Sequence, residues 1–433
     1  MERTQLSLDV HLYGERVGTL FPAGDNDYRL AYDPQLVERV GAGKALLSNS
    51  LPARSEPYSA EATRAYVEGL LPEGQRRARI GRELDIDETD GYLMLAELGH
   101  DCPGAVTFVP AGETVEQRDP DSISWLSEDE LAEVLKAPPP QLFSEEPPQR
   151  MRFALPGRRH KLSLVRDEEG DRWGWPEAGA ASTHVIKPET GEYPEYVANE
   201  MFCMTVCRQV GLPVAKASVA EIAGRRCLVS PRYDRIVSEG DGTVERVHCE
   251  SFCQALGIQP GPEDDSPESK APGWTEARGL INAVSRADEV VNLLTAAFCN
   301  YILGNGDAHG KNFVLIDRDR IALGGPDKKW RLAPLTDITS TVVYDDPIHH
   351  GLVISEEYQE TSYLLELAEV CEACEFDFEV LRGLAATTAT RVGMAIETIA
   401  TRSKKEGWHQ RIVDKIVEIA ADRSFGLGAE VEY

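Results

Sequence analysis

A glycine-rich segment at residues 304 to 312 carries Asp307 five positions before Asn312, and a second aspartate, Asp337, follows at a distance. A carboxylate can accept the proton of an attacking hydroxyl group. An amide oxygen and a second carboxylate can hold Mg²⁺ on phosphate groups. These residue types at this spacing indicate phosphoryl transfer from ATP.

The elements around the segment must bring Asn312 and Asp337 together. Apolar residues 290 to 303 predict a buried helix before the segment, and residues 313 to 316 predict a strand after it. Residues 331 to 335 can return antiparallel, which would place Asp337 beside the start of the first strand. The alternative is a polar loop in which Asp and Asn only cap turns. The Asp-x-x-x-x-Asn spacing is also that of the catalytic loop of protein kinases.

Further groups occur upstream in the order that kinases use. Lys187 ends an apolar strand at residues 183 to 187, and Glu200 lies on a predicted helix at residues 195 to 210, where it could pair with Lys187. A turn at residues 155 to 161, with Gly157 and Lys161, could cover phosphate groups, although Pro156 lacks an N–H donor. The alternative is an exposed lysine at a strand end and a solvated glutamate.

His309 follows Asp307 by two positions, and two interpretations stay open. It could donate to a phosphate oxygen, or it could only fix the loop by hydrogen bonding.

Composition limits the class of protein. The 433 residues suggest two or three domains, and 42% hydrophobic with 27% charged residues is typical of globular proteins. The formal net charge of -28 makes the chain alone a poor binder of nucleic acid, though it suits a basic partner protein or simply serves solubility. No apolar run is long enough for a membrane span and the start lacks a signal-peptide core, so we expect a cytoplasmic protein.

The nine cysteines do not indicate a disulfide framework. Cys371 and Cys374 have the spacing of half a zinc site, but no second pair follows at a suitable distance. Cys203 and Cys207, like Cys249 and Cys253, have helical spacing. We therefore expect small core residues rather than metal ligands.

Further elements are predicted along the chain. A hairpin is expected over residues 6 to 20, helices over 60 to 70, 90 to 98 and 127 to 136, and strands over 104 to 109, 217 to 223 and 226 to 230. Residues 153 to 165 read as strand, glycine turn and strand. Residues 260 to 273 lack an apolar period and predict a mobile loop, and helices are expected from about residue 363 to 422.

At this point the chain resembles the HipA-like serine/threonine kinases, the toxin halves of bacterial toxin–antitoxin pairs. The resemblance extends from about residue 4 to about residue 400. The residues that carry it lie at 47–52, 69–74, 98–105, 199–200, 232–235, 248–255 and 307–312.

The resemblance implies an α+β, two-lobed protein-kinase-like fold with an additional N-terminal α/β domain. It implies an N-terminal subdomain at residues 1–136, a Pro-rich linker at 137–149, an ATP-binding N-lobe at 150–245 and a mainly helical catalytic C-lobe at 246–433. ATP and Mg²⁺ would be the cofactors. The partner would be a small helix-turn-helix antitoxin, through which the chain would reach DNA, and the substrate a translation component such as an aminoacyl-tRNA synthetase.

The resemblance also assigns roles. Asp307 would be the catalytic base, the carbonyl of Pro231 and the N–H of Tyr233 would meet adenine, and Lys187 would bind phosphate. The full set of candidates is catalytic Asp307, His309 and Lys311, ATP-binding Lys187, Glu200, Pro231, Tyr233, Gly157, Lys161 and Asp234, and metal-binding Asn312 and Asp337. Two rival interpretations are a small-molecule or lipid kinase of the same outline, and a degenerate kinase that serves as a scaffold or transcriptional co-regulator.

One departure from the family concerns regulation. Family members commonly carry a serine in the glycine-rich loop, and its autophosphorylation switches the kinase off. The matching position here is Ala154, and Arg159 stands where a glutamine is usual. The switch should therefore be absent, and the nearby Ser163 is expected to belong to a strand face.

Overall fold

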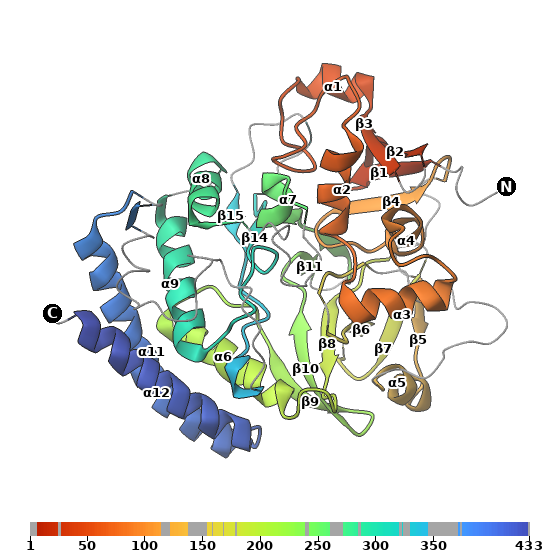
Figure 1. Ribbon diagram of the computed structural model, residues 1–433. Helices are drawn as coiled ribbons and strands as arrows, with labels where there is room; N and C mark the ends of the chain where they lie inside the picture. The colour runs from red at the N-terminus through yellow and green to blue at the C-terminus, as the bar shows by residue number, and fades with distance from the viewer. Residues whose placement is uncertain are drawn as a thin grey trace. The chain divides into compact units, whose positions relative to one another are not determined.

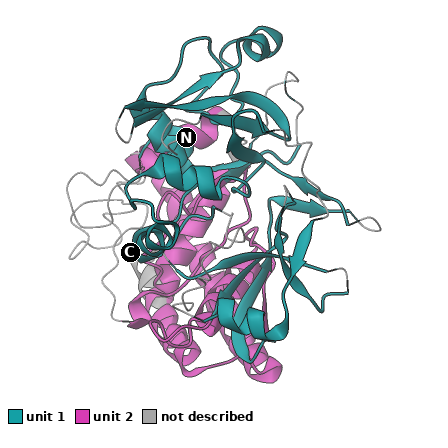
Figure 2. Ribbon diagram, turned by 90° about the vertical axis from the view of Figure 1, so that its right-hand side faces the viewer, with its two compact units in different colours: residues 1–188, 221–270, 315–330 teal, residues 189–220, 271–314, 331–433 magenta. Residues whose placement is uncertain are grey.

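The computed structural model describes residues 7–24, 27–113, 122–136, 154–157, 159–167, 169–177, 180–238, 242–259, 272–284, 287–319, 323, 330–344, 371–372 and 375–431. The chain divides into two compact units, which Figure 2 colours separately. Unit 1 comprises residues 1–188, 221–270 and 315–330, and unit 2 comprises residues 189–220, 271–314 and 331–433. The predicted linker at 137–149 lies outside the described residues, and the four-part division stays a prediction.

The first part of unit 1 is an antiparallel sheet with helices packed on it (Figure 1). Its strand order is β3-β2-β1-β4, and the hairpin predicted over residues 6 to 20 and the strand predicted over residues 104 to 109 are confirmed. Asp33, Ser59 and Asp90 cap three of the helices by accepting backbone N–H bonds, as polar residues at helix starts commonly do. The elements are β1 (Leu8–Leu12), β2 (Glu15–Gly24), β3 (Asp27–Tyr32), α1 (Pro34–Val40), α2 (Ala60–Glu68), α3 (Gly74–Leu84), α4 (Gly91–Leu98) and β4 (Val106–Pro110).

A second sheet, in the order β5-β7-β6-β8-β10-β9, follows. The pairs β5–β7, β7–β6, β6–β8 and β8–β10 are antiparallel, with Ile186 of β8 between Leu162 of β6 and Val229 of β10. Helix α5 begins at a capping box of Ser127 and Glu130. The elements are β5 (Ile123–Trp125), α5 (Glu128–Val134), β6 (Leu162–Arg166), β7 (Trp173–Pro176), β8 (His184–Pro188), β9 (Ser218–Ile222) and β10 (Arg225–Pro231).

The strand predicted before the glycine turn is wrong for the described residues 154–157, which contain no strand. Pro156 has no N–H to give to a ladder, and Gly157 has φ +101, which breaks an extended run. The segment is held instead by single contacts. Ala154 N–H donates to the Asp101 carbonyl, and Gly157 forms an isolated bridge with Pro72.

Unit 1 closes with β11 (Arg235–Val237), β12 (Val244–Arg246), β13 (Cys249–Ser251) and α7 (Phe252–Leu256). Two side chains of this stretch bind the N-terminal part of the unit. Glu250 accepts the Asn49 backbone N–H at 3.1 Å, and Gln254 donates to the Tyr66 carbonyl at 2.9 Å. These contacts explain why the segments near residues 48 and 250 occur together among the residues that carry the family resemblance.

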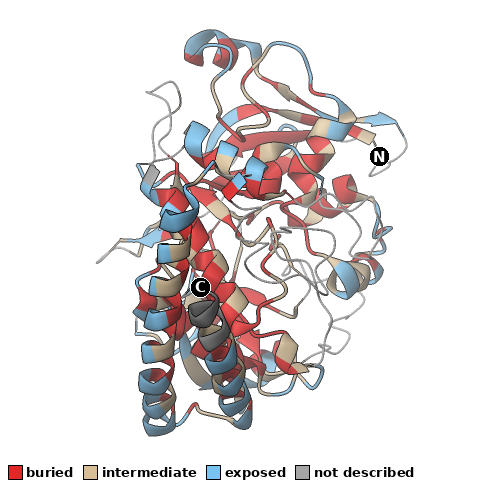
Figure 3. Ribbon diagram, turned by 60° about the vertical axis from the view of Figure 1, so that its left-hand side comes forward, coloured by how far each residue is buried: buried red, intermediate tan, exposed pale blue. Residues whose placement is uncertain are grey.

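Unit 2 is mainly helical, as predicted for the later part of the chain. Helices α11 and α12 lie side by side in Figure 1 and pack on α9 and α6. Their buried residues follow one helical face, whereas the other face is exposed (Figure 3). The elements are α6 (Tyr196–Val210), α8 (Trp274–Val284), α9 (Ala287–Leu303), β15 (Arg331–Leu332), the 3₁₀ turn η3 (Val342–Tyr344), α11 (Phe378–Glu406) and α12 (Arg411–Val431), while β14 (Val314–Ile316) crosses the boundary between the units.

Three smaller expectations meet different outcomes. The cysteines at helical spacing, Cys203, Cys207, Cys249 and Cys253, are buried and unbridged, which confirms that they are core residues. Cys374 and most of the predicted mobile loop, residues 260–271, lie outside the described residues. Among the helices that the structure describes, none has the length and apolar character that crossing a membrane requires.

Candidate active site

The segment at residues 304 to 312 leaves the end of α9 through a turn that requires glycine. Gly304 has φ +72, and a Cβ atom there would lie 2.4 Å from Cγ2 of Val342. Both the left-handed backbone and the close approach exclude a larger residue. The position of this glycine brings residues 340 to 342 against the start of the loop.

Hydrogen bonds inside the loop fix Asp307 and Asn312 relative to each other. Asp307 N–H donates to Oδ1 of Asn305 at 3.2 Å, and Nδ2 of Asn312 donates to the Asp307 carbonyl at 2.7 Å. The Asn312 amide is thereby oriented, with its nitrogen on the loop and its oxygen on the opposite side. The Asp307 side chain is 27% exposed, so solvent and a substrate hydroxyl can reach it.

His309 lies within the same loop. Its Nε2 is 3.4 Å from Oδ1 of Asp307, and its backbone N–H donates to the Asp307 carbonyl at 2.9 Å. Of the two interpretations open for His309, this geometry favours fixing the loop. Lys311 lies half-buried in the next turn.

Asp337 lies on a segment that is hydrogen-bonded on one side to the strand after the loop and on the other side to the start of the loop. Before it, Ala333 N–H donates to the Val314 carbonyl at 2.7 Å. After it, Thr341 N–H donates to the Gly304 carbonyl and its Oγ1 accepts the Gly306 N–H, both at 2.9 Å. Only a few residues separate Asp337 from each attachment, so the chain must keep it near the loop. The antiparallel return of residues 331 to 335 is consistent with these contacts, and the meeting of the Asn312 and Asp337 side chains at one metal ion stays a prediction.

The backbone at Asp337 is itself unusual. Its φ of 55° lies in the left-handed region, which few residues other than glycine adopt, although Asp and Asn tolerate it best. Strained backbone of this kind clusters at functional sites.

Helix α6 holds the Asp337 segment from the other side. Asn199 accepts the Ser340 N–H at 2.8 Å and donates to the Ser340 carbonyl at 2.9 Å, so one buried amide satisfies both backbone groups. Glu200, the next residue, is buried on the same helix. Sequence reasoning treated Asn199 only as part of a motif. The signal available in the sequence was a polar asparagine on the core-facing side of a predicted helix, which indicates a side chain that positions other groups.

The candidates in unit 1 lie on and beside the second sheet. Lys187 is buried on β8, where it is paired with Leu228 of β10. Gly157 N–H donates to Oε1 of Glu73 at 3.0 Å, and Nζ of Lys161 donates to the Pro156 carbonyl at 2.8 Å. Each of these residues therefore has a structural contact, and nucleotide binding by them stays a prediction.

The segment from Pro231 to Arg235 follows β10 and alternates in burial. Pro231 is exposed and Tyr233 is half-buried, whereas Arg232 and Asp234 are buried. Arg232 N–H donates to the Thr183 carbonyl at 2.9 Å, which continues the pairing of β10 with β8. The two residues expected to meet adenine are thus more exposed than the charged residues next to them in the chain.

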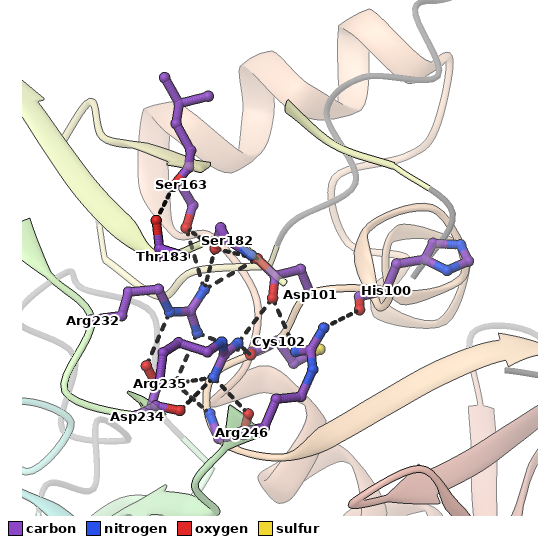
Figure 4. Close-up of polar contacts among 12 residues, drawn as sticks. His100, Asp101, Cys102, Ser163, Ser182, Thr183, Arg232, Asp234, Arg235 and Arg246 are labelled. Carbon is purple, nitrogen blue, oxygen red and sulfur yellow. Dashed lines mark hydrogen bonds and ion pairs between the residues drawn. The ribbon is translucent and has the colours of Figure 1, made fainter. Parts of the chain in front are cut away.

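Those charges belong to a buried ion network that the sequence did not predict (Figure 4). Nε and Nη2 of Arg232 bind the two oxygens of Asp234 at 3.0 and 2.8 Å. Nη1 of Arg232 lies 3.2 Å from Asp101, and Nη2 of Arg235 lies 2.9 Å from the same carboxylate. Arg246 adds a third cation, 3.0 Å from Asp101. Burial would raise the pKa of Asp234, but Arg232 and Arg235 outweigh it and lower the pKa to about 2.

These contacts give Asp234 a structural role. Its two oxygens accept bonds from Arg232, Arg235 and the Gly104 N–H. Its predicted place among the nucleotide-binding residues stays a prediction.

The chemistry of the loop in unit 2 suits Mg²⁺ carried on a nucleotide. Among the described residues, no group of three or more His, Cys, Asp or Glu side chains could hold a metal ion by itself. Mg²⁺ commonly takes one or two protein oxygens and completes its shell with phosphates and water. Asn312 and Asp337 have the oxygen-bearing side chains that such a pair needs, and their binding of Mg²⁺ stays a prediction.

Comparison with known proteins agrees with the motifs and the fold. Residues 8–109 match the model of the HipA N-terminal domain, and residues 153–406 match that of the HipA-like C-terminal domain. A relative from Sinorhizobium fredii, named "Putative kinase Y4mE", is 36% identical over 307 residues, 69% of each chain. The serine/threonine-protein kinase toxin HipA of Shewanella oneidensis is 23% identical over 349 residues, 77% of this chain and 76% of that one.

A solved structure shows the same fold. It is the complex of HipA with HipB and operator DNA from Shewanella oneidensis MR-1, which matches with a TM-score of 0.76 at 20% identity, over 98% of this chain and 96% of the HipA chain. The predicted α+β fold class and the resemblance are thereby confirmed. Both family models and the fold lead to one conclusion, that the chain belongs to the HipA-like kinase family.

Proposed function

We propose that this chain is an ATP- and Mg²⁺-dependent serine/threonine protein kinase. The observation that carries the proposal is the attachment of the Asp337 segment to the residues that flank the Asp307–Asn312 loop, at Gly304 and Gly306 before it and at Val314 after it. A turn-capping role would need no such double attachment. Family membership supports kinase chemistry in general terms.

In the proposed reaction a Ser or Thr hydroxyl oxygen attacks the γ-phosphorus of ATP. The new O–P bond forms while the bond to the β–γ bridging oxygen breaks, and ADP leaves with that electron pair. Asp307 accepts the hydroxyl proton, and His309 orients the Asp307 carboxylate. The oxygens of Asn312 and Asp337 hold Mg²⁺, which neutralises phosphate charge when it is bound.

The remaining candidates bind the nucleotide. Lys187 carries positive charge for the phosphates, and Glu200 is its proposed ion-pair partner. The Pro231 carbonyl and the Tyr233 N–H are proposed to meet adenine. Gly157, Lys161 and Lys311 are proposed to contact the phosphates.

We further propose that the chain is the toxin of a toxin–antitoxin pair with a small helix-turn-helix partner. The related Shewanella HipA was solved together with HipB and operator DNA. The formal net charge of -28 favours contact with DNA through a basic partner rather than directly. A translation component such as an aminoacyl-tRNA synthetase is the proposed substrate class.

The test is transfer of label from γ-³²P-ATP into a cell extract by the purified chain with Mg²⁺. We expect label in Ser or Thr of a protein band, identified by mass spectrometry. Label in a metabolite or lipid would establish the rival acceptor instead. Binding of ATP with no transfer to any acceptor would establish a degenerate kinase that acts as a scaffold.

The segment around Ala154, which matches the glycine-rich loop of the family, gives a separate prediction about regulation. We expect no label on the peptides that contain residues 154 and 163 after the chain is incubated with γ-³²P-ATP. Ala154 has no hydroxyl group, and Ser163 is fully buried, with its Oγ within hydrogen-bond distance of Ser182 Oγ and accepting from Arg232. Phosphopeptide mapping checks this, and label on Ser163 would contradict it.

A further inference from the structure

We propose that Asp101 is a positioning residue for nucleotide binding, because it anchors the backbone that carries Pro231 and Tyr233. The proposal rests on the proposed kinase function. Asp101 belongs to the N-terminal domain, between α4 and β4, and it contacts no part of the proposed site directly. It acts through Arg232 and Arg235.

The contacts of Asp101 divide between its two oxygens. Oδ2 accepts from Nη1 of Arg232 at 3.2 Å and from the hydroxyl and the N–H of Ser182. Oδ1 accepts from Nη2 of Arg235 at 2.9 Å and from Nη1 of Arg246 at 3.0 Å. The carboxylate therefore binds both ends of the segment from Arg232 to Arg235, and all three arginines converge on it in Figure 4.

Backbone groups next to Asp101 in the N-terminal domain also hydrogen-bond the segment from Arg232 to Arg235. The Cys102 carbonyl accepts from Arg232 at 3.1 Å and from Arg235 at 2.9 Å, and the Gly104 carbonyl accepts from Arg235 at 2.9 Å. In return the Gly104 N–H donates to Asp234 at 2.7 Å. Gly104 has φ +76, and a Cβ there would lie 2.7 Å from the Cys249 nitrogen, so only glycine allows this approach.

The charge balance of the network explains why loss of Asp101 should disturb the arginines more than loss of an ordinary hydrogen-bond partner. The network holds three arginines against two aspartates, and four of these side chains are almost fully buried, whereas that of Arg246 is 13% exposed. Without Asp101, three buried cations would face one carboxylate, and uncompensated buried charge is strongly unfavourable. Arg232 and Arg235 would then move toward water and carry the backbone of residues 231 to 235 with them.

Buried and more exposed residues alternate along this segment. Movement of the buried arginines should therefore also displace the residues that are proposed to contact the nucleotide. Arg232 and Asp234 lie inside the network, and Pro231 and Tyr233 lie on its outer side. A shift of the inner side chains therefore changes where the Pro231 carbonyl and the Tyr233 N–H lie. Adenine recognition would weaken, whereas the groups of unit 2 that act on the phosphate and hydroxyl keep their own contacts.

The test compares Asp101→Asn with Arg246→Gln in the full-length chain. The Arg246 side chain binds Asp101 and the His100 carbonyl but no side chain of residues 231 to 235, and the strand pairing of its backbone with Arg235 does not depend on the side chain. Its replacement therefore disturbs the same network without releasing the segment. For Asp101→Asn we expect KM for ATP and Kd for adenosine to rise together, by about tenfold if the binding-competent backbone falls to about a tenth of the population. We expect kcat at saturating ATP to stay within about twofold. For Arg246→Gln we expect both KM and Kd to stay within about twofold.

A purely structural role would give another result. It would lower the fraction of active protein, and so kcat per total protein, while KM and the adenosine Kd stayed at wild-type values. That result, or an equal rise of KM in Arg246→Gln, would overturn the proposal. If Asp101→Asn does not fold, Ser182→Ala takes its place. Its Oγ bonds Asp101 and accepts from Arg232 at 2.9 Å, so a smaller rise in KM is expected and an unchanged KM would overturn the proposal.

Failure of the proposed function looks different from failure of this inference. If the wild-type chain binds neither adenosine nor ATP, the kinase proposal falls and takes the inference with it. If the wild type binds both and Asp101→Asn binds them equally well, only the positioning role is lost.

Discussion

Replacing Asp307 by Asn should lower kcat for phosphoryl transfer by about a hundredfold to ten-thousandfold, the range in which a general base contributes. The amide keeps the size of the side chain but cannot accept the proton of the attacking hydroxyl. The loop should survive, because three of the bonds that fix it use the backbone N–H and carbonyl of Asp307, and only the longer contact of 3.4 Å with His309 uses its carboxylate. The measurement is the steady-state rate of label transfer at saturating ATP.

The matched control is Asp319→Asn, which removes an exposed carboxylate just after β14. We expect this variant to transfer phosphate at the wild-type rate. ATP binding by Asp307→Asn, followed by equilibrium titration, should stay within about twofold of wild type, since the proposed metal and nucleotide groups are untouched. Activity near wild type in Asp307→Asn would remove Asp307 from the role of base.

The elements around Asp307 could be predicted from the sequence because their signals are local, whereas the catalytic role of the loop stays a prediction. Asp307 and Asn312 lie within one short loop, between an apolar run that forms a helix and an apolar run that forms a strand. The same holds for α6, where the period of the core residues and the glycine at 211 define the element. Local hydrogen bonds then stabilise the elements that the spacing of the residues predicts.

The ion network could not be predicted, since it depends on contacts that spacing does not encode. Asp101 and Arg232 are separated by 131 positions, and each alone reads as an ordinary surface charge. Only the fold shows that both are buried and paired. The strand expected at residues 153 to 157 failed for a local reason, because Pro156 and Gly157 oppose an extended ladder more strongly than the apolar residues favour it.

Replacing Asp337 by Asn or by Gly separates metal binding from backbone strain. Both variants lose the carboxylate, and both tolerate the φ of 55° at this position, glycine without strain and asparagine nearly so. If Asp337 binds Mg²⁺, both should lose roughly a hundredfold or more in kcat and should need more Mg²⁺ to reach half-maximal rate. Binding of Mn²⁺ in the presence of ATP, followed by electron paramagnetic resonance, gives a readout that does not depend on turnover.

Both substitutions should lose activity only if the charged carboxylate of Asp337 is what matters. If Asp337 serves mainly to hold a strained turn, Asp337→Gly should keep wild-type activity and gain thermal stability, since glycine adopts this backbone freely. Full activity in Asp337→Gly would therefore exclude Asp337 as a metal ligand. Loss of Mn²⁺ binding in both variants, with the bonds at Gly304 and Thr341 keeping the segment in place, would leave the missing carboxylate as the cause.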